Sequence, residues 1–142
     1  MTSYLGETYR GLRVLVTGHT GFKGAWLSLW LHHLGADVTG YALRPCTDPS
    51  LHEVAGLQHR IRSVIGDVRD RSALERVFSE THPEIVFHLA AQARVDVSYA
   101  DPRGTFEVNV CGTGEVLATA LATDGFRAAV VVTSDKCYEN QG

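Results

Sequence analysis

Short runs of apolar residues recur along the chain and are bounded by glycine, proline and polar residues. Continuous apolar runs, in place of alternating ones, are typical of strands that are buried on both faces, as in a parallel sheet. The pattern therefore predicts a parallel sheet with both faces covered. The strands are expected at residues 12–17, 37–43, 62–65, 84–89 and 126–132.

Apolar residues at helical spacing predict longer helices between these strands. The first helix carries leucines on one side and Phe22, Trp26 and Trp30 on another, so we expect it to pack on the sheet and against a further element. The two prolines within residues 44–50 predict a loop after the second strand. The helices are expected at residues 21–34, 72–80 and 102–123.

Strand and helix alternate along the chain, which is typical of the α/β class. We therefore predict a doubly wound, Rossmann-type parallel sheet with helices on both faces. Because crossovers between parallel strands are right-handed, the expected strand order is 3-2-1-4-5. No linker, repeat or low-complexity segment divides the sequence, so residues 1–142 are expected to form one domain.

Composition and charge argue against several classes of protein. The 142 residues are 44% hydrophobic and 20% charged with a net charge of −3, which is the profile of one globular domain. The mildly acidic balance gives no support to nucleic-acid or anionic-membrane binding. Arg69 and Arg71 alternate with acids and apolar residues, which indicates a solvated surface. No apolar run reaches membrane-spanning length, and the polar N-terminus is unlike a signal peptide.

The cysteines and histidines do not suggest a metal site. Cys46, Cys111 and Cys137 are scattered and form no metal-binding or redox spacing. Their presence fits a reducing cytoplasm, where we expect the protein to be located. The seven histidines include no pair at metal-ligand spacing with a third ligand nearby, so we expect no metal.

A glycine-rich turn follows the first predicted strand directly. Gly18, Gly21 and Gly24 stand at three-residue spacing between that strand and the first helix. In a dinucleotide-binding unit, the first glycine permits a tight turn, the second lets the backbone approach a pyrophosphate, and the third lets helix and strand pack closely. The pyrophosphate then lies against backbone N–H groups at the positive end of the helix. Glycines also mark ordinary turns, but the order strand, turn, helix favours a nucleotide site.

Other strand ends carry small or polar residues, and ligands of such sheets bind at these ends. Asp67 is placed to accept a hydrogen bond from an adenine amino group or, alternatively, to begin a helix. Ala90 and Ala91 leave room for a cofactor, or simply pack in the core. Asn109 falls inside the third long helix, where asparagine is a poor helix former. This indicates an inward polar role, with a solvated position as the alternative.

Ser134, Asp135 and Lys136 follow the fifth predicted strand. A hydroxyl, a carboxylate and an amine at one strand end can provide a hydrogen bond, a general acid and a general base. A surface ion pair in a loop explains the same residues equally well from their spacing.

Several of these segments together resemble the extended short-chain dehydrogenase/reductase family. The resemblance covers essentially the whole chain but only the amino-terminal part of a full member. We therefore expect the sheet to be truncated after its fifth strand, with the substrate domain absent. The segments that carry the resemblance are residues 17–24, 40–45, 66–70, 88–92, 109–113 and 133–140.

Within this family the likeness is to nucleotide-sugar 4,6-dehydratases of deoxysugar biosynthesis. It implies NAD as the cofactor, CDP-glucose as the substrate and a homodimer in the full-length form. In such enzymes hydride leaves C4 of the sugar, water is eliminated across C5 and C6, and the hydride returns to C6. The expected cofactor-binding residues are Gly18, Thr20, Gly21, Phe22, Gly24, Asp67, Val68, Leu89, Ala90, Ala91, Asn109 and Thr133.

The same resemblance implies roles for the three residues after the fifth strand. The family residue that matches Ser134 hydrogen-bonds the C4 oxygen. The match to Asp135 is the acid that protonates the departing C6 hydroxyl, and the match to Lys136 is placed to take the C5 proton. A charge that neutralises Asp135 is the alternative role for Lys136.

Two features depart from the family pattern. No tyrosine is followed by lysine four residues later, so the catalytic Tyr-x-x-x-Lys pair is missing. In relatives the pair lies beyond the point where this sequence ends, and we expect the 142-residue chain alone to be inactive. The acid expected about 20 residues after the glycine turn to hold the adenosine ribose is also absent. Asp37 comes too early, and Arg44 allows NADP as an alternative cofactor.

Two other interpretations stay open. One is a UDP-N-acetylglucosamine-type 4,6-dehydratase, against which the run from Cys137 to Asn140 argues. The other is a non-catalytic NAD(P)-binding module. A Tyr-x-x-x-Lys pair encoded beyond Gly142 would support an enzyme, and a genuine stop there would support the module.

Overall fold

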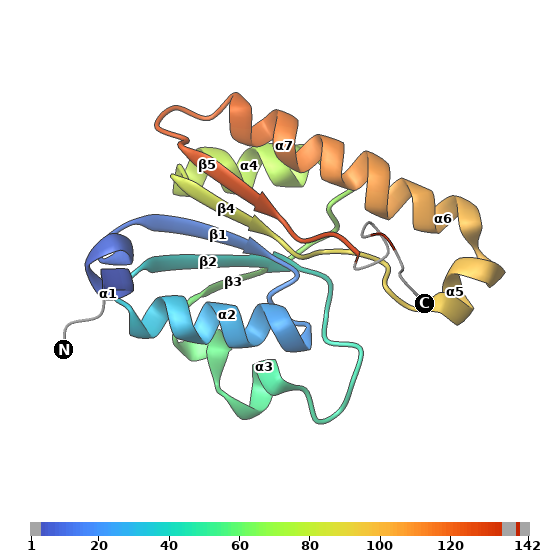
Figure 1. Cartoon of the computed structure of the whole chain (residues 1–142), viewed down its shortest axis with the longest axis horizontal. Helices are drawn as coiled ribbons and strands as arrows, with labels where there is room; N and C mark the ends of the chain where they lie inside the picture. The colour runs from blue at the N-terminus through green and yellow to red at the C-terminus, as the bar shows by residue number, and fades with distance from the viewer. Residues whose placement is uncertain (1–3, 135–138, 140–142) are drawn as a thin grey trace.

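A computed structural model describes residues 4–134 and 139 of the chain. Within them the strands form one sheet in the order β3-β2-β1-β4-β5, and each neighbouring pair is parallel (Figure 1). The predicted α/β class and strand order are therefore confirmed. The strands are β1 (Arg13–Thr17), β2 (Asp37–Ala42), β3 (Arg62–Ile65), β4 (Ile85–His88) and β5 (Ala128–Val131).

Helices lie on both faces of the sheet (Figure 1). One face carries α2 (Phe22–His33), α3 (Leu51–Val54) and the 3₁₀ turn η1 (Leu57–His59). The other face carries α4 (Arg71–Thr81) and α7 (Thr113–Leu121).

The helix predicted over residues 102–123 is present but changes its hydrogen bonding on the way. It begins as α6 (Pro102–Phe106), continues as the π-helical segment η2 (Glu107–Gly112) and ends as α7. Asp101 caps its start, where Oδ1 accepts a hydrogen bond from Gly104 N at 2.9 Å. Two short helices, α1 (Tyr4–Tyr9) and α5 (Val95–Ala100), complete the described part of the chain.

The central strand β1 divides the core into two layers. Leu15 packs with Phe78 and Val116 on the side of α4 and α7, whereas Val14 and Val16 pack on the side of α2. All three β1 residues are at most 1% exposed. Burial on both faces, which the continuous apolar run predicts, is confirmed for this strand.

The same prediction is wrong for β5. Ala129 packs against the core under α7, but Val130, which points the other way, is 48% exposed. β5 is the outermost strand at its side of the sheet. The helices on the α2 face lie over the opposite part of the sheet, so they leave this face of β5 open (Figure 1).

The outer side of α2 is also open in the described structure. Trp26 and Trp30 are each 53% exposed, so the further element expected to cover them is not among the described residues. Among the same residues, no helix has the length and apolar character to cross a bilayer.

Candidate functional site

Two cavities lie at the carboxyl edge of the sheet and share Ala90 and Ala91 as lining residues. The first, of about 270 Å³, extends from the glycine-rich turn across the ends of β2 and β3. The second, of about 590 Å³, lies between the end of β4, the residues after β5 and the α5–η2 region. Predicted site residues in the first cavity are Gly18, Thr20, Gly21, Asp67, Val68 and Leu89. Those in the second are Asn109, Thr133 and Ser134.

The glycine-rich turn has the backbone geometry that its spacing predicts. Gly18 has a φ of +77°, and a Cβ there would lie 2.8 Å from Ala90 N. A Cβ at Gly24 would lie 2.1 Å from the carbonyl oxygen of Gly18, so this glycine permits the close contact between the turn and α2. At Gly21 the nearest atom would be 3.4 Å away.

The N-terminus of α2 opens toward the first cavity. Gly21 precedes the helix, and no side chain among the described residues caps its first turn. Backbone N–H groups at an uncapped helix start favour an anion, both as donors and through the helix dipole. The turn can therefore hold a phosphate. Phe22 itself is 71% exposed and lies outside the lining of either cavity.

A chain of hydrogen bonds between uncharged side chains runs from β1 to the wall of the second cavity. His88 Nε2 is 2.9 Å from Thr113 Oγ1, and His88 Nδ1 is 2.7 Å from Thr17 Oγ1. The Thr113 hydroxyl donates to Asn109 O at 2.7 Å, so we assign the His88 proton to Nε2. The Thr17 hydroxyl then donates to Nδ1, while its oxygen accepts from Ala90 N at 3.1 Å. Burial lowers the pKa of His88, which favours this neutral form.

A second buried histidine supports the glycine-rich turn from below. His19 is fully buried, its Nε2 lies 2.6 Å from Ser63 Oγ, and its ring packs edge-on against His52. A Cβ at Gly40 would lie 2.2 Å from the His19 ring, so β2 needs a glycine beside it. Burial, followed by the nearby His52, lowers the pKa of His19 to about 4. The turn is thus held by an uncharged imidazole at neutral pH.

Asp67 lines the first cavity, and its backbone and its carboxylate are held by different residues. The Tyr41 hydroxyl donates to the Asp67 carbonyl oxygen at 2.8 Å, and a Cβ at Gly66 would clash with the Tyr41 ring at 2.5 Å. Burial, with Asp70 and Asp67 nearby, raises the pKa of Tyr41 to about 12, so this hydroxyl stays a donor. The carboxylate of Asp67 is held separately by Arg69.

Asn109 points inward and fixes the loop after β4. Its Oδ1 accepts from Gln92 N at 2.8 Å, and its Nδ2 donates to Gln92 O at 3.0 Å. The Gln92 side chain in turn donates to Thr105 Oγ1 at 3.1 Å. Asn109 therefore shapes the wall of the second cavity by binding protein backbone.

Thr133 and Ser134 line the second cavity, as expected for residues that follow β5. Asp135 and Lys136 lie outside the described residues. Among the residues that are described, no three His, Cys, Asp or Glu side chains gather in a way that could hold a metal ion.

Comparison with known proteins places the chain in a family. The family model described as GDP-mannose 4,6 dehydratase matches residues 15–138. The chain belongs to this family.

The GDP-mannose 4,6 dehydratase family match agrees with individual relatives. CDP-glucose 4,6-dehydratase of Salmonella typhimurium strain LT2 is 51% identical over 133 residues, which cover 94% of this chain and 37% of that relative. A probable dTDP-glucose 4,6-dehydratase of Sinorhizobium fredii is 35% identical over 77% of this chain and 31% of its own length. The chain thus spans about a third of these relatives. The inferred likeness to nucleotide-sugar 4,6-dehydratases is confirmed.

Solved structures of related epimerases share the fold. Epimerase Mth375 from Methanothermobacter thermautotrophicus superposes with a TM-score of 0.79 at 28% identity, covering 99% of this chain and 40% of that one. The UDP-glucose 4-epimerase of Thermus thermophilus, solved in complex with NAD, gives a TM-score of 0.68 at 34% identity, covering 77% of this chain and 33% of that one.

Several residues that shape this family site were not predicted from the sequence. His19 and His88 both lie within segments that carry the family resemblance, and a histidine in a continuous apolar strand end is a signal for a buried hydrogen bond. Tyr41 gave no such signal, because an apolar strand position suits tyrosine without any partner. Arg69 is exposed, as its sequence context predicts, but its contact with Asp67 was not predicted.

Proposed function

We propose that the protein is an NAD-dependent nucleotide-sugar 4,6-dehydratase that converts CDP-glucose to CDP-4-keto-6-deoxyglucose, and that this chain forms its cofactor-binding part. The observation that carries the proposal is the 51% identity to CDP-glucose 4,6-dehydratase over 94% of the chain. A cytoplasmic location and a homodimer belong to the same proposal.

The first cavity fits the adenosine and pyrophosphate half of NAD. The uncapped start of α2 and the exposed Gly21 before it suit the pyrophosphate. The carboxylate of Asp67 lines the cavity and can accept a hydrogen bond from the adenine amino group. When bound, NAD would take a hydride from C4 of the sugar and return it to C6.

The second cavity suits the nicotinamide ring and the sugar. Ala90 and Ala91 leave space between the two cavities, and Ser134 lines the second one. We assign the Ser134 hydroxyl to the C4 oxygen of the sugar. Asp135 would protonate the departing C6 hydroxyl, and Lys136 would remove the C5 proton. Lys136 can act as a base only with a pKa well below that of a free lysine.

The choice between NAD and NADP depends on the edge of the first cavity. Leu43 and Arg44 line it where a ribose-binding acid is expected, and the Thr20 hydroxyl fixes this segment by donating to Leu43 O at 2.9 Å. An absent acid weakens the hold on the ribose. We therefore propose that NAD is preferred but bound weakly. Tighter binding of NADP in a calorimetric titration would show that Arg44 decides the choice.

The test of the reaction uses the complete gene product. It is incubated with NAD and, in separate samples, CDP-glucose, UDP-N-acetylglucosamine or GDP-mannose, and the 4-keto-6-deoxy products are followed by NMR. Turnover of CDP-glucose supports the proposal. Preferred turnover of another sugar nucleotide would contradict the proposed substrate, and NAD binding without any turnover would favour a non-catalytic module.

In a Lys136→Ala variant we expect the rate of water elimination to fall more than the rate of hydride transfer. The formation of reduced NAD measures the hydride transfer.

A further inference from the structure

We propose that Arg69 is a positioning residue for adenine recognition: it holds the Asp67 carboxylate in the orientation that accepts the adenine amino group. The inference rests on the proposed NAD site and adds a residue to it.

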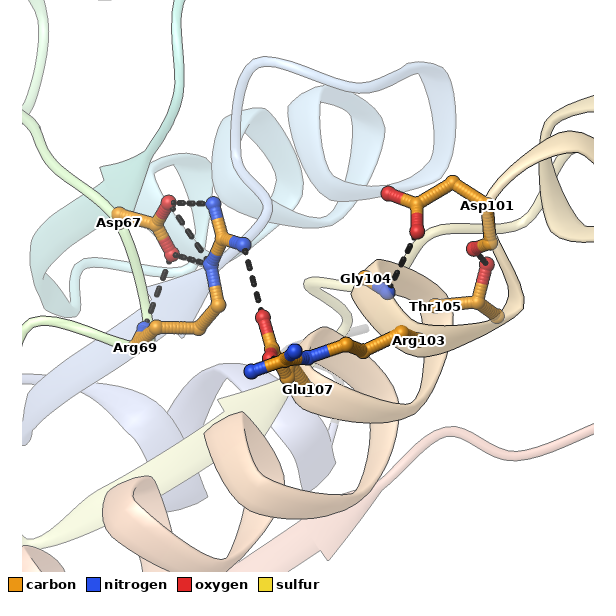
Figure 2. A network of polar contacts seen from close by, with 7 residues as sticks. All are labelled: Asp67, Arg69, Asp101, Arg103, Gly104, Thr105 and Glu107. Atoms are coloured by element: carbon orange, nitrogen blue, oxygen red, sulfur yellow. Dashed lines mark hydrogen bonds and ion pairs between the residues drawn. The ribbon is translucent and has the colours of Figure 1, made fainter.

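Both the backbone and the side chain of Arg69 donate hydrogen bonds to the Asp67 carboxylate. Its backbone N–H donates to Asp67 Oδ1 at 2.9 Å, and its guanidinium Nη2 donates to Oδ2 at 2.6 Å. The guanidinium Nε lies 3.1 Å from each of the two oxygens. Figure 2 shows the planar group facing both carboxylate oxygens. Such a fork fixes a carboxylate in one plane, which a lysine ammonium, as a point charge, cannot do.

Arg69 is itself held from its far side. Its Nη1 lies 3.8 Å from Glu107 Oε2, and Glu107 Oε1 accepts from Arg103 Nε at 2.9 Å (Figure 2). Glu107 belongs to η2, so the chain of charges ties the turn after β3 to the helix across the cavity edge. Arg69 thus lies between two carboxylates, and its guanidinium has a defined position.

The held carboxylate keeps room for a ligand. The Asp67 side chain is 27% exposed and lines the first cavity. A carboxylate offers about four lone-pair positions. Arg69 presents three N–H donors to it, because one Nε–H is shared between the two oxygens, and this leaves capacity for one further donor. The hydrogen bond from the Arg69 side chain is also the main cause that lowers the pKa of Asp67, so the carboxylate stays ionised as an acceptor. Because Tyr41 fixes the backbone of Asp67 separately, removing the Arg69 guanidinium would loosen only the Asp67 carboxylate, which keeps the hydrogen bond from the Arg69 backbone N–H.

The experiment compares two dinucleotides that differ at the adenine amino group. Calorimetry on the nucleotide-stripped complete protein measures Kd for NAD and for nicotinamide hypoxanthine dinucleotide, in which a carbonyl oxygen replaces that amino group. We expect Arg69→Gln to weaken NAD binding about ten-fold and to leave the hypoxanthine analogue within about two-fold, so that the preference for NAD is largely lost. Arg71→Gln, which removes a neighbouring arginine that is paired with Glu75, should keep the wild-type preference.

A double-mutant cycle separates positioning from a general structural role. Asp67→Asn should lose the preference for NAD, and adding Arg69→Gln to it should change the preference no further. Arg69→Lys should restore only part of it. An unchanged preference in Arg69→Gln, tighter NAD binding in that variant, or equal weakening of both dinucleotides would overturn the inference while the NAD site stands. A wild-type protein that binds no NAD would overturn the proposed function as well.

Discussion

At the scale of single residues, the site rests on buried polar groups that carry no charge. Thr17, His88 and Thr113 form a continuous chain in which each hydrogen bond has one consistent donor. Buried donors and acceptors that lose their partners are costly, so such a chain specifies one arrangement of the strand end. It also fixes the N–H of Ala90, and with it the wall between the two cavities.

Replacing Thr113 by valine should destabilise the fold by about 1–3 kcal/mol, because the Nε2–H of His88 is left buried without an acceptor. The measurement is the free energy of unfolding in urea. Thr119→Val is the matched control on the same helix, since the Thr119 hydroxyl bonds to the backbone oxygen of Glu115 and to no other partner that the structure gives among the described residues. Its cost should stay below about 1 kcal/mol. Equal losses in the two variants would argue against the assigned network.

The buried His19 predicts a loss of stability in mild acid. Its pKa is about 4 in the folded chain and 6.5 as a free group, so between these values the unfolded chain binds more protons than the folded one. The stabilising neutral form is fully present above pH 6.5, and its contribution falls as the pH drops toward 4. The whole effect amounts to about 3 kcal/mol for this residue.

Urea unfolding at several pH values between 7 and 4 tests this expectation. His19→Gln should make the pH dependence less steep, whatever its own stability at pH 7, because the amide does not titrate. The buried His88, whose pKa is also lowered, keeps part of the slope. His59→Gln replaces an exposed histidine and should leave the slope unchanged. A His19→Gln variant with the wild-type slope would show that His19 is not the group that titrates.

At the scale of elements, the strands were predicted closely and the short helices were missed. β3 matches its predicted range, and the other strands begin or end within two residues of theirs. The bounds of such strands can be predicted from the local sequence, because each is an apolar run that glycine, proline or polar residues end. By contrast, α3 has four residues, too few to show a helical period. It forms because Ser50 caps it, accepting from Glu53 N at 3.2 Å, and because Leu51 packs on the core under α2.

The π-helical segment contains a contact that local sequence patterns do not predict. The poor helix propensity of Asn109 pointed to an inward polar role, and the structure has Asn109 facing inward. Its partner, the backbone of Gln92, lies 17 residues away in an irregular loop, so no spacing rule connects them. Arg69 is a different case, because Asp67 is only two residues away, and their contact depends on the conformation of the turn after β3.

The candidate site was predictable to the extent that it depends on backbone. The glycine spacing, the strand ends and the class of fold together indicated where a dinucleotide would lie. The supports beneath it, from Tyr41, His19 and His88, connect residues that are distant in sequence, such as His88 and Thr17 at a separation of 71. Contacts of this kind follow from the strand order and register, which a pattern of single residues does not contain.

At the scale of the whole molecule, the long helix presents apolar side chains to solvent. Phe106 and Val110 are 59% and 52% exposed, and Leu121 at the end of α7 is 77% exposed. Ala118 of α7 is exposed as well. These exposed residues lie along the continuous helix α6–η2–α7 and are called the apolar stripe below. Exposed apolar patches favour association, which supports the expected homodimer.

Val110→Glu should therefore shift the protein toward monomers, because a dimer would bury the new carboxylate beside apolar side chains without a partner. Sedimentation velocity over a range of concentrations measures the change, and the dissociation constant should rise at least about ten-fold, since an unpaired buried charge costs more than about 1.4 kcal/mol. Val54→Glu is the control: Val54 is more exposed, at 73%, but lies on α3, away from the apolar stripe. It should leave association unchanged. A wild-type protein that sediments as a monomer at every concentration would contradict a dimer through this helix, and an equal effect of both variants would point to a general response to added charge.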